Sequence, residues 1–158
     1  MALIHQLFAN PIFQFVFQVF GAYLSAVTAS MMLEAPRKLI QQAGVVGGIG
    51  YVAYLLVLPN STVPLATFYA CVVVAICAQV SARVFKAPVT IFYIPAFFPY
   101  VPGSAIYQTA LTFIQGDTAA SASHLSQTLM IAGAIALGVF TVDSMLEIYN
   151  YLSQKRKA

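Results

Sequence analysis

The sequence predicts an all-helical integral membrane protein with five membrane-crossing segments. Hydrophobic residues make up 61% of the 158-residue chain and charged residues only 7%, whereas a soluble domain carries about a quarter charged residues. The mean hydropathy is +0.86. Five apolar runs, residues 8–33, 39–58, 64–80, 88–115 and 125–151, are each long enough to cross a bilayer as a helix. Residues 1–158 therefore form a single transmembrane domain.

The first span, 8–33, carries small and polar residues at helical spacing, from Gln14 and Gln18 to Ala29. Such a stripe is typical of close helix packing, and the alternative is the lining of a polar path. No Lys or Arg precedes the span, and its apolar run is longer than that of a typical signal peptide. We therefore expect a membrane helix here, followed by a charged loop over residues 34–38.

The second span contains four glycines, Gly44, Gly47, Gly48 and Gly50. Gly44 and Gly48 are four residues apart, which is the spacing at which small residues let two membrane helices approach closely. We interpret the four glycines as a helix-packing surface.

The third span, 64–80, is rich in Val, Ala and Ile and contains both cysteines. Cys71 and Cys77 are six residues apart, so they lie on different faces of a helix and cannot pair with each other. We interpret them as small apolar core residues.

The fourth span, 88–115, is expected to be broken. Pro95, Pro99 and Pro102-Gly103 fall inside it, and each proline removes a backbone donor and collides with the preceding turn. We expect an irregular or short helical half before Pro102 and a regular helix over residues 103–115. A break in hydrocarbon survives where protein or a water-filled cavity covers it, and broken helices often build transporter sites. The alternative is a proline-kinked span without a ligand.

The charges predict the topology. With five crossings, the loops around Arg37 and Arg83 and the tail 155–157 lie on one side, so all seven basic residues share it. The loops at Asn60 and Asp117 lie opposite and contain no basic residue. The positive-inside rule then predicts an external N-terminus and a cytoplasmic C-terminus. A helix over residues 103–115 is roughly 20 Å long, so we expect its N-terminus well inside the hydrocarbon core.

The helix after the break carries Ser104, Gln108, Thr112 and Gln115 on one face, with Tyr107 beside it. Amide N–H groups at residues 103–106 would lack helical partners, and the positive end of the helix dipole favours a carboxylate there. We predict a solute cradle, and the alternative is hydrogen bonding to neighbouring helices.

The last span contains two acidic residues on one helical face, Asp143 and Glu147. Because an ionisable group within a membrane is a functional candidate, Asp143 is a candidate proton carrier, with an interfacial pair or a subunit contact as the alternative. For Glu147 we favour an interfacial role.

The chain lacks the motifs of an enzyme or of a metal site. No nucleophile and base occur at a catalytic spacing, and His5 and His124 have no metal-binding partner at a suitable spacing. The sequence contains no run of basic residues interleaved with aromatic residues, which would be expected of a nucleic-acid-binding protein. We therefore expect no enzyme activity and no cofactor.

The chain resembles the smaller component of the threonine/serine exporter family. The resemblance covers nearly the whole chain and rests on Ala35-Pro-Arg-Lys-Leu39 with the glycines that follow, and on Pro99-Tyr-Val-Pro102-Gly103-Ser-Ala-Ile-Tyr107. The family implies export of threonine and serine or of dicarboxylates such as succinate, from the bacterial inner membrane, together with a larger subunit.

These observations support a transport subunit in which Pro99, Pro102 and Gly103 shape the site. Ser104, Tyr107 and Gln108 would contact a small anionic or zwitterionic solute, and Asp143 would carry the coupling proton. We expect a homo- or hetero-oligomer in the lipid bilayer. The alternative is an assembly subunit that stabilises the larger polypeptide without touching solute.

Overall fold

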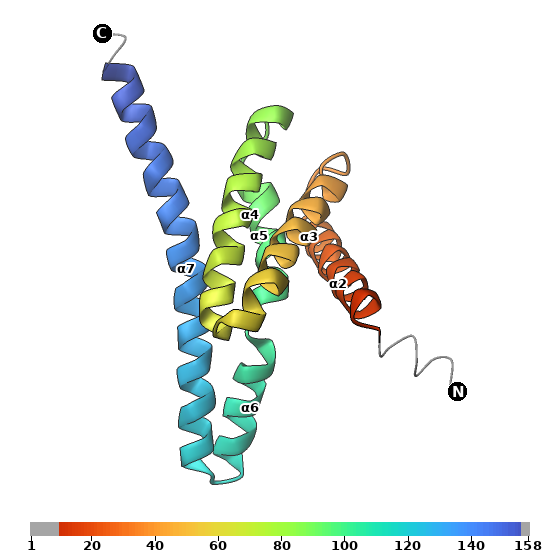
Figure 1. The fold of residues 1–158 in the computed structure, drawn as a ribbon, viewed down its shortest axis with the longest axis vertical. Helices are drawn as coiled ribbons and strands as arrows, with labels where there is room; N and C mark the ends of the chain where they lie inside the picture. Colours follow the sequence, from red (N-terminus) through yellow and green to blue (C-terminus); the bar gives the residue numbers. More distant parts are fainter. Residues whose placement is uncertain (1–9, 156–158) are drawn as a thin grey trace.

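The structure is a computed structural model that describes residues 10–155. Helices joined by short turns make up this whole region, and no strand occurs within it (Figure 1). In chain order the elements are α2 (Pro11–Met32), α3 (Ile40–Val57), the 3-10 helix η1 (Leu58–Asn60), α4 (Val63–Phe85), α5 (Thr90–Phe97), the 3-10 helix η2 (Phe98–Tyr100), α6 (Gly103–Ile114) and α7 (Thr118–Lys155).

Four helices are long and apolar enough to cross a membrane, so the chain is a multi-pass membrane protein. They cover Pro11–Met32, Ile40–Asn60, Val63–Phe85 and Thr118–Ser153. The predicted all-helical membrane class is thereby confirmed. The predicted fourth span is not a helix of membrane length, because it is divided into α5 with 8 residues and α6 with 12.

The helices α2 to α5 form a bundle in which α3 occupies the centre. α2 and α4 pack on opposite sides of α3, and α5 packs against all three of these helices. The core contains Phe92 of α5, which is fully buried among small side chains such as Ala43 of α3 and Ala78 of α4. Small residues at these contacts let the membrane helices approach closely.

α7 runs along the whole molecule and joins two regions (Figure 1). Its N-terminal part pairs with α6, and the two form a hairpin that extends beyond the start of α4. Its middle part packs on α4 and buries Ile131, Ala134 and Val142. No residue of α6 is buried.

Local sequence signals explain where several helices begin and end. Asn10 caps α2, because its side chain accepts the N–H of Ile12 at 3.0 Å, and Pro11 follows at the first position. Lys86 ends α4 in the left-handed conformation with φ 52°. The Asp117 carboxylate accepts the N–H of Ala120 at 2.9 Å and caps the start of α7.

Two expected boundaries differ from the structure. The polar stretch 116–124, expected as a loop, is mostly the first part of α7, which begins at Thr118. This stretch is rich in Ala and Ser and contains no Pro, so it can form a helix. The Asp117 cap begins the helix at this point. α4 continues to Phe85 rather than ending near Val80, because no proline intervenes before Pro88.

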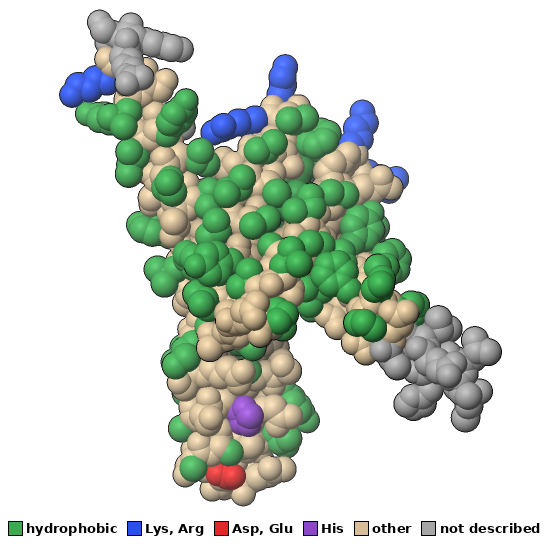
Figure 2. Space-filling model, viewed as in Figure 1, with side chains coloured by type: hydrophobic (Ala, Val, Ile, Leu, Met, Phe, Trp, Pro, Cys, Tyr) green, Lys and Arg blue, Asp and Glu red, His purple; other side chains and the backbone are tan. Residues whose placement is uncertain are grey.

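The basic residues of the described chain lie at one end of the molecule (Figure 2). Lys and Arg side chains gather at one end, and the hairpin of α6 and α7 carries an acidic and a histidine side chain at the other (Figure 2). The hairpin connection contains Asp117, and His124 lies two turns into α7. Arg156 and Lys157 lie outside the described residues.

Candidate functional site

The break in the fourth segment lies at Val101 and Pro102. Val101 is extended with φ −60° and ψ 124°, and Pro102 has the non-helical ψ of 53°. The helical hydrogen bonds stop there, and the N–H of Gly103 instead donates to the carbonyl oxygen of Val101 at 2.7 Å. Residues 92–114 are therefore not one continuous helix.

The prolines have different effects at their positions. Pro99 lies at the start of η2, where no N–H is needed. Pro102 disfavours a helical conformation at Val101, and this ends the helix. The expectation that Pro95 also breaks the segment is wrong, since it lies inside α5. Burial of Phe92, Pro95 and Ala96 holds that short helix together despite the missing donor.

Fewer amide groups are open at the start of α6 than expected. The N–H of Gly103 donates to Val101, and that of Ile106 donates to the Pro102 carbonyl at 3.0 Å. Within the described part of the chain, this leaves the N–H groups of Ser104 and Ala105 without a hydrogen-bond partner. Two donors, rather than four, are available to a ligand.

The predicted solute-binding residues lie together on the surface of the chain. Gly103, Ser104 and Gln108 are exposed, and Tyr107 is 63% exposed. A Cβ placed on Gly103 would meet no atom within 4 Å. Among residues 10–155, nothing forms an opposite wall to this face.

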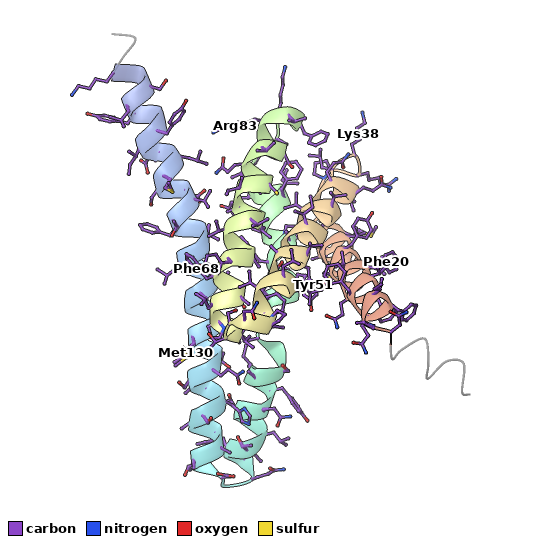
Figure 3. All side chains as sticks on the ribbon, viewed as in Figure 1. Phe20, Lys38, Tyr51, Phe68, Arg83 and Met130 are labelled. Carbon is purple, nitrogen blue, oxygen red and sulfur yellow. The ribbon has the colours of Figure 1, made fainter. Side chains whose placement is uncertain are left out.

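The break lies near one end of the helix bundle. The ring of Tyr100 lies 6.1 Å from that of Tyr51 and 5.9 Å from that of Tyr54. These two residues belong to the last two turns of α3, and Tyr51 lies toward that end of the helix (Figure 3). α3 has 18 residues, about 27 Å, which is close to the thickness of a hydrocarbon core. The break is therefore near the end of the bundle that faces away from the basic residues.

Tyr100 is a feature that sequence reasoning missed. Its side chain is only 5% exposed, and its hydroxyl has no hydrogen-bond partner among residues 10–155. It lies against Gly50, where a Cβ would stand 2.8 Å from the hydroxyl oxygen. The absence of a side chain at Gly50 therefore leaves room for Tyr100. The sequence signal for this contact was the position of Gly50 in a glycine-rich helix.

The other three glycines of α3 lie against α2. A Cβ on Gly47 would stand 2.7 Å from Ala26 Cβ, and one on Gly44 would stand 2.8 Å from Tyr23 Cε2. Gly48 is less crowded, with Tyr23 Cβ at 3.7 Å. Gly44 and Gly47 therefore make the closest approaches to α2.

Asp143 is held by a side chain from another helix. Gln79 Nε2 of α4 donates to Asp143 Oδ1 of α7 at 2.9 Å, and the pair is partly buried. The carboxylate is also near enough to Tyr93 of α5 for the two groups to interact electrostatically. Glu147, one turn further along α7, is exposed. Sequence reasoning missed Gln79, which is 64 residues away along the chain.

The structure does not bring Asp143 and the break together. Gln79 lies six residues before the end of α4, about 9 Å from the basic end of that helix. The break lies toward the opposite end of the bundle. The two regions are nevertheless linked by one segment, because α5 carries Tyr93 near Asp143 and η2 carries Tyr100 beside the break.

No metal centre occurs in the described region. Residues 10–155 contain no group of three or more His, Cys, Asp or Glu side chains that could hold a metal ion. Both cysteines are free. His5 lies outside the described residues, and His124 is partly buried on α7.

One comparison with known proteins identifies a family. The family model described as "Threonine/Serine exporter, ThrE" matches residues 18–145, which is more than half of the chain. No curated protein and no solved structure matches the chain. The match includes the glycines of α3, the break before α6 and Asp143. The chain therefore belongs to the threonine/serine exporter family.

Proposed function

We propose that this chain is one subunit of a bacterial inner-membrane exporter that acts with a larger subunit. Its solutes would be small amino acids such as threonine and serine, or dicarboxylates such as succinate. The family membership supports export. The observation that carries the proposal is the broken helix, whose polar face no other described part of the chain covers.

The exposed face supports a site shared between two polypeptides. Ser104 and Gln108 offer a hydroxyl and an amide, the N–H groups of Ser104 and Ala105 are free, and Tyr107 lies beside them. The larger subunit would supply the opposite wall. The backbone N–H groups at the start of α6 would stay accessible to a carboxylate because of Pro99, Pro102 and Gly103. Because the break is near the end opposite the basic residues, this site would serve the exit side of the path.

The proposed topology has five crossings, with an external N-terminus and a cytoplasmic C-terminus. α5, η2 and α6 together would make the fourth crossing. The gathering of Arg37, Lys38, Arg83, Lys86 and Lys155 at one end supports it (Figure 2). Asp117 lies at the other end.

Asp143 would carry the coupling proton. Three polar groups lie near it: Gln79 of α4, Tyr93 of α5 and, one turn away on its own helix, Glu147. Arg83 is one turn from Gln79 on α4. Loss of the Asp143 charge would weaken its hydrogen bond to Gln79. It would also remove the electrostatic interaction with Tyr93 of α5, the segment that leads to Tyr100 at the break.

The decisive experiment measures export by cells that make this chain with a larger family member. Efflux of serine, threonine and succinate is compared between the native chain and the double variant Ser104→Ala/Gln108→Ala. We expect a rise in the half-saturating solute concentration of about tenfold, as for the loss of one hydrogen bond to a charged group. Subunit amounts in the membrane are measured in parallel.

Gln115→Ala provides the matched control, because it also removes an exposed amide from the same helical face but lies at the far end of α6. Its export kinetics should equal those of the native chain. Native kinetics for the double variant would defeat the binding role and favour the alternative, in which the chain only stabilises its larger partner.

A further inference from the structure

A groove runs between α3 and α4 in the half of the bundle near the basic residues. Its volume is about 510 Å³. Val45 and Ile49 of α3 and Ile76 and Val80 of α4 form its apolar walls, and each of these side chains is about half exposed. No described part of the chain covers the groove.

Polar side chains lie at the basic end of the groove. Gln41, Gln42 and Ser81 line it there, and none of them makes a hydrogen bond within the described chain. The Gln42 Oε1 atom, an acceptor, is buried and has no partner in the part of the chain that the structure describes. Ser30 of α2, by contrast, bonds to the Ala26 carbonyl of its own helix at 2.8 Å. Because unmet polar groups are costly beside hydrocarbon, the groove offers a ligand unused hydrogen-bonding capacity.

Basic residues flank this end of the groove on both helices. Lys38 lies two residues before the start of α3, and Lys86 directly follows Phe85, which lines the groove. Figure 3 shows Lys38 at the same end of the bundle as Arg83. An apolar channel with polar and basic groups at one end matches a molecule with a hydrocarbon chain and an anionic head.

The length of the groove suits a lipid chain. Along α4 the lining extends over nine residue steps, from Ile76 to Phe85, about 14 Å. An extended acyl chain can follow an apolar groove of this length.

We propose that the groove between α3 and α4 binds one anionic phospholipid. An acyl chain lies along Val45, Ile49, Ile76 and Val80. The amide N–H groups of Gln41 and Gln42 and the hydroxyl of Ser81 donate to ester oxygens, and a head-group hydroxyl such as that of phosphatidylglycerol donates to Gln42 Oε1. The phosphate is held between Lys38 and Lys86. This binding is independent of the exported solute.

The chain contains no tryptophan, so a single introduced tryptophan can report on the lipid beside it. Val80→Trp places the probe in the groove, and Phe140→Trp places it on an exposed face of α7. Each variant is reconstituted in phosphatidylcholine vesicles or in equal parts of phosphatidylcholine and phosphatidylglycerol, with bromine-labelled acyl chains on one lipid at a time. Quenching by each labelled lipid gives its relative affinity at the probe.

We expect phosphatidylglycerol to be preferred about tenfold over phosphatidylcholine at Val80→Trp, and no preference at Phe140→Trp. Adding Lys38→Gln and Lys86→Gln should abolish the preference, whereas Lys155→Gln should leave it unchanged. Ile49→Trp on the other wall gives an independent reading. Equal quenching by both lipids at Val80→Trp and Ile49→Trp would overturn the proposal. Absence of quenching by either lipid at both positions would also overturn it and would indicate a polypeptide in the groove.

Discussion

Gly138 and Gly133 provide a matched test of how closely α7 packs on α4. A Cβ on Gly138 would stand 2.8 Å from Cys71 Cβ and 3.0 Å from the carbonyl oxygen of Phe68. The carbonyl belongs to the backbone of α4, so it cannot turn aside. A Cβ on Gly133 would meet no atom within 4 Å. Substitution by alanine is therefore expected to create a steric clash at Gly138 but not at Gly133, five residues earlier on the same helix.

The expected difference in stability follows from this contrast. Each substitution gains about 1 kcal/mol of helix propensity, and this gain cancels when the two variants are compared. Overpacking at Gly138 costs about 1 to 3 kcal/mol. We expect Gly133→Ala to raise the free energy of unfolding by up to about 1 kcal/mol, and Gly138→Ala to lie about 1 to 3 kcal/mol below Gly133→Ala.

The free energy of unfolding is measured by titrating the purified chain in mixed micelles with a denaturing detergent and following helix content by circular dichroism. Gly21→Ala on α2 is a second control, because a Cβ there also meets no atom within 4 Å. If Gly138→Ala were as stable as Gly133→Ala, the close approach of α7 to Phe68 and Cys71 would be refuted.

Three further predictions concern single side chains. Asp143→Asn should abolish gradient-driven export while subunit amounts in the membrane stay unchanged; native export rates would remove Asp143 from the coupling step. Tyr100→Phe should raise the free energy of unfolding by about 1 kcal/mol, because it removes a buried hydroxyl without a partner; a loss of stability in the detergent titration would mean that the hydroxyl is bonded. Lys86→Gly should also stabilise the chain, by about 1 kcal/mol, since Lys86 has a left-handed φ of 52°; lower stability in that titration would show that the lysine side chain contributes more than its backbone strain costs.

Features that depend on neighbouring residues could be predicted from the sequence. The break before Gly103 follows from the effect of Pro102 on its own backbone and on Val101, so its position required no knowledge of the fold. The helix over residues 103–115 was predicted for the same reason and ends at Ile114, one residue before the final Gln115. The polar residues 118–124 are typical of a loop, but the structure has them in α7, because the Asp117 cap begins the helix there.

Features that depend on distant residues could not be predicted in this way. The hydrogen bond between Gln79 and Asp143 joins helices that are separated by α5 and α6 in the chain. Tyr100 and Gly50 meet only because η2 returns to α3. The position of the break relative to the bundle likewise depends on how far the α6 and α7 hairpin extends past α4 (Figure 1). Helical spacing gives the face of a residue, but it does not give the partner.

The packing of α7 on α4 has a consequence for biosynthesis. α2 and α3 are adjacent in the chain and can associate as soon as both have left the ribosome. The face of α4 around Cys71 stays uncovered until Gly138 has been translated, because α7 packs on that face at this glycine. During this interval the nascent chain presents an unfilled helix face to the insertion machinery. Premature termination before α7 would therefore leave an unfinished bundle for membrane quality control to recognise.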